Sequence, residues 1–197
     1  MPAYQNLVAW VITTMLTLQP AYDPKSCWWG VHWTDTYETT AEQFVQAAIN
    51  NPLQSKKDGP DVIFTIALMM EWASKESRFK PDAVGDGGHS YGIFQVNPYT
   101  AGKPPEVLLT PSLAAPVALD LFHFSFKACK DRPVSERMAQ YAWGRDCEHR
   151  LELSRSRMAT ARELARTFDR WTVEKMPALP MVDSPVTKRV TERTLPR

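Results

Sequence analysis

The chain has 197 residues, of which 44% are apolar and 23% are charged. This composition is typical of an ordinary globular protein, and the length allows one domain with a sizeable core plus extensions. The formal net charge is +1, which excludes the strongly basic balance of most nucleic-acid-binding proteins, so we expect no nucleic-acid partner.

Basic side chains are concentrated in the second half of the chain. Residues 127–170 carry eleven basic and seven acidic side chains, whereas residues 1–76 carry four basic and eight acidic ones. A basic region can attract an anionic polymer such as cell wall or nucleic acid. Because opposite charges are interleaved there, we favour a solvated helix face.

Residues 1–38 are predicted to form an N-terminal extension. Its apolar segment, Leu7–Leu18, has only twelve residues, whereas a membrane-spanning helix needs about 20, so we expect no transmembrane span. The length also suits the core of an export signal, but no Lys or Arg precedes it and no clear cleavage site follows. A docking or amphipathic helix is therefore favoured.

Aromatic residues cluster at the end of this extension, at Trp28, Trp29, Trp33 and Tyr37. Such rings can stack on sugars, anchor a partner chain or cover a neighbouring apolar surface. Covering the main domain is the interpretation we favour.

Helical patterns fill residues 39–172, which we expect to form the main domain. The sequence Thr-Thr-Ala-Glu at 39–42 predicts the start of a helix. Asp61 is predicted to cap the next helix, Val62–Ser77, whose nearly continuous apolar run is typical of a central core helix. Further helices are predicted from residue 110, over residues 133–143 and over residues 147–172.

The remaining segments are predicted to be turns or extended chain. Lys80–Pro81 predicts the stop of the central helix, because the residue before a proline avoids the helical region. The sequence Gly-Asp-Gly-Gly at 85–88 predicts a tight turn or small hairpin. The predicted fold class is therefore mainly α, with at most a small β-hairpin near Gly85–Tyr91. Residues 173–197 are rich in Pro and Thr and are predicted to form an extended tail.

Three cysteines leave the redox state open. Cys129 and Cys147 can pair if the protein works outside a reducing cytosol, leaving Cys27 unpaired, but buried free thiols fit equally well. The two residues could also bind a metal together with His123 and His149. Their spacing matches no standard zinc pattern, so we expect no metal and no cofactor.

Glu76 lies where the central helix is predicted to give way to a loop. A carboxyl group at such a corner can be half buried and still reach a substrate. The alternative is a helix-end carboxylate that pairs with Arg78 or Lys80. The block that follows the loop, Tyr-Gly-Ile-Phe-Gln-Val-Asn-Pro at 91–98, favours a functional role for Glu76.

Three motifs follow one another along the chain: Glu76-Ser77 with Phe79-Lys80-Pro81, then Ser90-x-Gly92-x-x-Gln95-x-x-Pro98, and then Ala139-Gln140-Tyr141-Ala142-Trp143-Gly144. Together, in this order, they resemble the lytic transglycosylase (SLT) branch of the lysozyme-like superfamily. Lys80 replaces the family's usual Asn, Phe94 its usual Met and Ala142 a second usual Asn. The resemblance covers about residues 40–170 and implies a lysozyme-like helical domain.

The segment from Tyr91 to Asn97 is also similar to the corresponding strand of c-type lysozymes. That family carries its second catalytic carboxylate, an Asp, immediately before the Tyr, whereas this chain has Ser90 there. The difference favours a transglycosylase with one acid over a hydrolase with two carboxylates. Asp86, in the glycine loop, is a weaker candidate for a second carboxylate and is more typical of a turn residue.

The resemblance to transglycosylases implies roles for individual residues. Glu76 is the expected acid and then base, while Gln95 would contact the sugar and Tyr141 would hydrogen-bond Glu76 and orient it. Weaker candidates for substrate contact are Ser90, Asn97 and Phe94. Glu71, five residues before Glu76, would point away from it and have a structural or solvent-facing role.

The expected function is cleavage of the β-1,4 bond between MurNAc and GlcNAc in peptidoglycan glycan strands, with formation of 1,6-anhydro-MurNAc. A lysozyme-type muramidase and a non-catalytic wall-binding or assembly subunit remain alternatives. The expected location is a virion or the cell envelope (periplasm), where the enzyme would open the wall locally for a phage genome. Export by an N-terminal signal is the other possibility. Residues 1–38 and 173–197 are candidate contacts for other virion or secretion-complex proteins.

Overall fold

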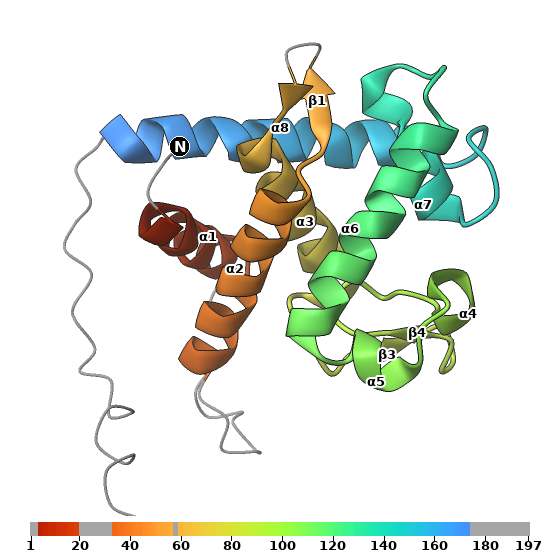
Figure 1. Ribbon diagram of the computed structural model, residues 1–197, viewed down its shortest axis with the longest axis horizontal. Coiled ribbons are helices and arrows are strands. Elements are labelled where there is room, and N and C mark those ends of the chain that lie inside the picture. Colours follow the sequence, from red (N-terminus) through yellow and green to blue (C-terminus); the bar gives the residue numbers. More distant parts are fainter. Residues whose placement is uncertain (1–3, 20–32, 57–58, 174–197) are drawn as a thin grey trace, which may run out of the picture.

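The computed structural model describes residues 4–19, 33–56 and 59–173, and they fold into a mainly helical body (Figure 1). The predicted fold class is confirmed. The long helices are α1 (Tyr4–Leu18), α2 (Trp33–Asn50), α3 (Val62–Ser77), α6 (Pro111–Ala128) and α8 (Leu151–Val173). Short helices are α4 (Pro98–Ala101), α5 (Pro105–Leu108), α7 (Ala139–Trp143) and the 3-10 helix Val134–Glu136.

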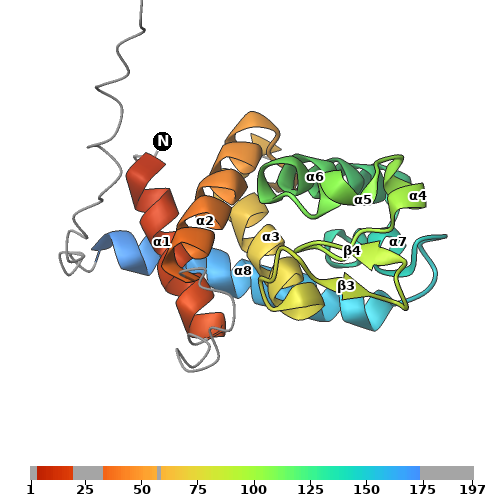
Figure 2. The same ribbon diagram turned by 90° about the horizontal axis from the view of Figure 1, so that it is seen from below.

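Helix α3 is the centre of the core. Its bounds are those predicted, and the Asp61 carboxylate caps it by accepting a hydrogen bond from the backbone N–H of Phe64 at 2.9 Å. The helix packs against α1, α2 and above all α8, and Figure 2 shows it between the α1–α2 pair and the β3–β4 hairpin. Buried residues therefore occur around most of its circumference.

The C-terminal end of α3 lies where it was predicted, but Lys80–Pro81 does not form the stop. The helix ends before Lys80–Pro81, because Arg78 and Phe79 have φ angles of 57° and 61°, in the left-handed region. The backbone N–H of Arg78 bonds back to the carbonyl of Ser74, and that of Phe79 to the carbonyl of Ala73, which closes the last turn. The chain therefore turns immediately after Glu76.

Helix α1 belongs to the folded body. Trp10, Val11 and Met15 are buried in the same core as α3. The Trp10 indole N–H donates to the Thr167 hydroxyl of α8 at 3.0 Å, and its ring lies edge-on to Phe168 with centroids 5.1 Å apart. Helix α1 thus packs against α8, which agrees with the prediction of a docking helix.

Among the described residues, no helix is both long enough and apolar enough to cross a membrane.

Helix α2 starts earlier than predicted. It begins at Trp33, so the Thr-Thr-Ala-Glu sequence lies inside the helix and Thr40 is fully buried. Tyr37 is also buried and packs edge-on against Phe79, with centroids 6.0 Å apart, so this ring does cover the main domain. Trp28, Trp29 and Cys27 lie outside the described residues.

Two further boundaries differ from the prediction. The helix predicted over residues 133–143 is divided into a 3-10 turn and α7, and the helix predicted from residue 147 begins at Leu151. The predicted tail lies outside the described residues from residue 174 onward. A small hairpin of β1 (Gln54–Lys56) and β2 (Gly59–Pro60), which was not predicted, precedes α3.

The predicted hairpin is present beside the end of α3. Strands β3 (Val84–Gly85) and β4 (Ser90–Tyr91) are antiparallel, with Val84 opposite Tyr91 and Gly85 opposite Ser90. At Gly92, where φ is 74°, a Cβ atom would lie 1.8 Å from the carbonyl oxygen of Leu108, so only glycine fits this contact with α5. The hairpin is thereby held against the helical body.

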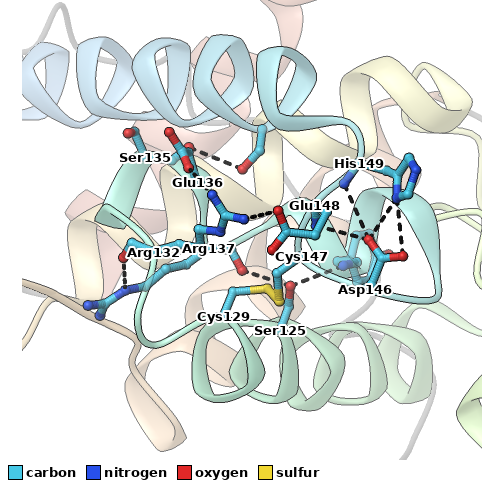
Figure 3. Close-up of a disulfide and its surroundings, with 12 residues drawn as sticks. Ser125, Cys129, Arg132, Ser135, Glu136, Arg137, Asp146, Cys147, Glu148 and His149 are labelled. Carbon is cyan, nitrogen blue, oxygen red and sulfur yellow. Dashed lines mark hydrogen bonds and ion pairs between the residues drawn. A yellow bond between two sulfur atoms is a disulfide. The ribbon is translucent and has the colours of Figure 1, made fainter.

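A disulfide joins Cys129, which follows α6, to Cys147, which precedes α8 (Figure 3). Beside it, Arg132 forms an ion pair with Glu148, and the Asp146 carboxylate bonds the His149 ring at 2.8 Å. The bond closes a segment with a sequence separation of 18 that contains α7. It fixes this segment, and with it the start of α8, to the end of α6.

Candidate active site

Glu76 lies in the last turn of α3, and its side chain is 29% exposed. This is the half-buried position that the sequence predicted for a carboxylate at a helix end. Its partner, however, is neither Arg78 nor Lys80. The Oε1 atom accepts a hydrogen bond from Nη1 of Arg157 at 2.5 Å, and Arg157 comes from α8, 81 residues away in sequence.

Arg157 is itself almost buried, with 9% of its surface exposed. Its guanidinium carbon lies 4.4 Å from the centroid of the Trp72 ring. Trp72 and Glu76 lie one turn apart on the same face of α3, so one arginine contacts both. Sequence reasoning missed this residue, because it lies in a helix with many arginines and no local signal distinguishes it.

Tyr141 is held close to this cluster but does not bond Glu76 directly. Its hydroxyl donates to the backbone carbonyl of Phe94 at 3.2 Å, whereas the family resemblance had implied a hydrogen bond to Glu76. Burial raises the pKa of the Tyr141 hydroxyl, and the nearby charge of Glu76 raises it further. The tyrosine therefore stays protonated at neutral pH and remains a hydrogen-bond donor.

Two side chains hold the loop backbone next to Glu76. The Ser77 hydroxyl donates to the carbonyl of Ile93 at 2.8 Å, and Tyr141 bonds the next carbonyl, that of Phe94. Tyr141 is in turn positioned by Ser125 of α6, whose hydroxyl accepts the Tyr141 backbone N–H at 3.0 Å. The Glu-Ser and Tyr motifs thus meet in space at this loop.

Gln95 lies across the base of the hairpin. Its side-chain amide donates to the carbonyls of Ala83 and Gly92 at 3.1 and 2.8 Å. Its Oε1 atom lies so close to Gly85 that a Cβ there would be 2.1 Å away. Gln95 therefore holds the loop closed in this structure, and its predicted contact with sugar stays a prediction.

The three weaker substrate candidates also have structural partners. The Ser90 hydroxyl is buried and donates to the Asp86 carboxylate at 2.5 Å, while the Asn97 side-chain oxygen caps α4 by accepting from the N–H groups of Tyr99 and Thr100. The Phe94 ring is 1% exposed and packs in the core, so it offers a ligand almost no surface. Substrate contact by these residues is not shown.

Two other acidic residues have positions unlike that of Glu76. Asp86 bonds Ser90 within the hairpin turn, which is the turn role favoured from the sequence. Glu71 is only 2% exposed, and its Oε2 atom has no hydrogen-bond partner among the described residues. Burial raises the pKa of Glu71, although the charges of Lys75 and Arg157 act against the rise. Because Glu71 is buried, the structure agrees with the structural role expected for it and not with the solvent-facing one.

The described residues contain no group of three or more His, Cys, Asp or Glu side chains placed to hold a metal ion. Cys129 and Cys147 are joined in a disulfide, so they cannot serve as thiolate ligands in the alternative metal site with His123 and His149.

A mainly helical domain whose central helix ends in a partly exposed carboxylate, next to a small hairpin, is a lysozyme-like domain. A family model described as "Transglycosylase SLT domain" matches residues 52–161. This match spans more than half of the sequence, so the chain belongs to the transglycosylase SLT family. Comparisons with curated proteins and with solved structures found no match. Family membership supports lytic transglycosylase-type activity on peptidoglycan in general.

Proposed function

We propose that the protein is an active lytic transglycosylase that cleaves the β-1,4 bond between MurNAc and GlcNAc, and that Glu76 is its catalytic acid and base. The observation that carries the proposal is the position of Glu76. It is a partly exposed carboxylate at the end of the central helix, within the residues that match the family. The next residue, Ser77, bonds the carbonyl of Ile93, and Tyr141 bonds that of Phe94.

The proposed reaction needs one carboxyl group in two protonation states. Protonated Glu76 donates to the glycosidic oxygen as the bond to C1 of MurNAc breaks, and the N-acetyl oxygen of the sugar stabilises the positive charge at C1. The Glu76 carboxylate then accepts the proton of the C6 hydroxyl, whose oxygen bonds C1. The products are a 1,6-anhydro-MurNAc end and a GlcNAc end, without consumption of water.

The hydrolase alternative requires a second carboxylate. The position that would supply it carries Ser90, which is buried and bonded to Asp86. Asp86 itself is engaged in the hairpin turn. These contacts favour the single-acid mechanism over a muramidase mechanism, and the products distinguish the two.

The first prediction concerns Glu76→Gln, which keeps the shape of the side chain but cannot donate or accept the proton. We expect cleavage of purified peptidoglycan to fall by at least about 10²-fold, in line with the loss of a general acid. Glu163→Gln is a matched control, because Glu163 is exposed and pairs with Arg166 and Arg170 on the outer part of α8. It should retain full activity.

Mass spectrometry of the released fragments completes the test. Fragments with 1,6-anhydro ends support a transglycosylase, whereas fragments with reducing ends support a muramidase. Full activity of Glu76→Gln would exclude Glu76 as the catalyst. Binding of glycan by the wild-type protein without any turnover would support the non-catalytic alternative.

We further propose that the enzyme works outside the cytosol, at the cell envelope or in a virion, and opens the wall locally for passage of a phage genome. The Cys129–Cys147 disulfide supports a site outside the reducing cytosol. The burial of α1 in the core favours an N-terminal segment that stays with the mature protein rather than a cleaved signal. Mass spectrometry of the protein isolated from virions or envelopes would test this, since a fragment starting after Leu18 would exclude retention of α1.

A further inference from the structure

We propose that Arg157 is a positioning residue for Glu76. It holds one carboxylate oxygen and thereby leaves the other oxygen to exchange protons with the glycan. The inference rests on the proposed role of Glu76 as acid and base, and it assigns a function to a residue outside the three sequence motifs.

The geometry of the Glu76 carboxylate is asymmetric. Its Oε1 atom accepts the hydrogen bond from Nη1 of Arg157 at 2.5 Å. Within the described part of the chain, no hydrogen bond to Oε2 is found, and the side chain is 29% exposed. A charge-assisted hydrogen bond to a guanidinium is stronger and more directional than a neutral one. The contact therefore fixes the torsion of the carboxylate, which otherwise could rotate about the end of a flexible side chain.

Arg157 is itself fixed by its surroundings. The guanidinium lies over the Trp72 ring at 4.4 Å, and the side chain is 11% exposed, so it has little freedom to move away from Glu76. The planar guanidinium group suits both contacts, whereas the ammonium group of lysine offers neither the stacking surface nor the fork of donors. Rigid support of this kind matters because a displacement of about 1 Å can cost about 10²-fold in rate.

The ion pair between Arg157 and Glu76 is surrounded by other ionisable groups. Burial raises the pKa of Glu71, and the charges of Lys75 and Arg157 act against this rise. Burial and the charge of Glu76 raise the pKa of Tyr141, whereas the charge of Arg157 lowers it. Lys75 is exposed. Arg157 thus interacts with two carboxylates of α3, and among the described residues only that of Glu76 is hydrogen-bonded to it.

A purely structural ion pair between α3 and α8 is the competing explanation. Loss of a buried partner would then lower the free energy of unfolding without altering the turnover of the molecules that remain folded. A positioning role makes a different prediction, because it lowers kcat of the folded enzyme and leaves KM nearly unchanged.

The experiment compares Arg157→Met and Arg157→Lys with Arg155→Met as the matched control. Arg155 lies on the same helix and pairs with Glu136, and its side chain is 53% exposed. We expect Arg157→Met to lower kcat by about 10²-fold with KM within about twofold. Arg157→Lys should recover part of the loss because it restores the charge. Arg155→Met should keep the wild-type kcat, although it removes the partner of the buried Glu136 and thereby lowers the stability.

If Arg157→Met does not fold, the double variant Glu71→Gln/Arg157→Met removes the buried carboxylate that the arginine also balances. Near-ultraviolet circular dichroism verifies the fold of each variant. A folded variant without Arg157 that retains the wild-type kcat, exceeds it, or loses activity only through KM would overturn the proposal. Glu76→Gln separates the two inferences: if that variant stays active, the proposed function fails, and if only the Arg157 variants stay active, the positioning role fails.

Discussion

Arg78 ends the central helix in a conformation that suits glycine. Its φ of 57° lies in the left-handed region, and the residue is exposed, so its side chain contributes little packing there. Arg78→Gly should raise the free energy of unfolding by about 1 kcal/mol, because glycine adopts this conformation without steric cost. Urea denaturation measures the change. Arg78→Ala is the control, since alanine keeps the steric cost and should show no gain.

Glu71 makes the stability depend on pH. Because burial raises its pKa in the folded state, the folded protein retains a proton that the unfolded chain releases above the ordinary value. The free energy of unfolding therefore decreases as the pH rises through this interval. Glu71→Gln removes the effect and should be more stable than the wild type at pH 7 but not at pH 4.

Thermal unfolding at several pH values measures the Glu71 effect. The exposed Glu163→Gln variant provides the comparison, because its difference from the wild type should change little with pH. A stability difference for Glu71→Gln that is the same at pH 4 and pH 7 would contradict the assignment.

At this scale, the sequence predicted the position of Glu76 at a helix end but not its partner Arg157. Glu76 could be found because a helix end and a downstream motif mark it. Arg157 could not, because its contact with Glu76 depends on how α8 packs on α3, 81 residues away. The hydrogen bond of Tyr141 to the Phe94 carbonyl depends equally on the path of the loop.

Helix α1 contributes to the stability of the whole domain through Trp10. The ring is 1% exposed, and its N–H bonds Thr167 of α8. Trp10→Ala should lower the free energy of unfolding by about 3 kcal/mol or more, since it leaves a cavity between α1 and α8. Leu16→Ala, on the same helix but 43% exposed, should cost much less. Equal losses for the two variants in urea denaturation would contradict this role.

Helices were predicted well where their signals are local. Asp61 and the apolar run after it defined α3 to the residue, because a cap and a buried face are both encoded in adjacent positions. The start of α2 was placed too late, because Thr39–Glu42 has the pattern of a helix start but lies within a longer helix. The stop of α3 was attributed to Lys80–Pro81, although the left-handed backbone conformation of Arg78 is what ends the helix at the predicted residue, Ser77.

The disulfide acts on the molecule as a whole. It closes a segment with a sequence separation of 18 between α6 and α8, and a loop of this length corresponds to a stabilisation of about 3 kcal/mol. Reduction, or the double variant Cys129→Ser/Cys147→Ser, should lower the midpoint of thermal unfolding by several degrees. The double variant should not respond further to reductant. The sequence could name this pair but could not choose between a disulfide and free thiols.

The disulfide also distinguishes the protein inside a producing cell from the protein outside the cytosol. Tyr141 lies inside the segment that the disulfide closes, and Arg157 lies on the helix that follows it. In a reducing cytosol the two thiols remain apart, so the segment that carries Tyr141 and the start of α8 would be less firmly held than in the oxidised protein. Under the proposed function, the reduced protein inside a producing cell would therefore cleave glycan more slowly than the oxidised protein outside the cytosol.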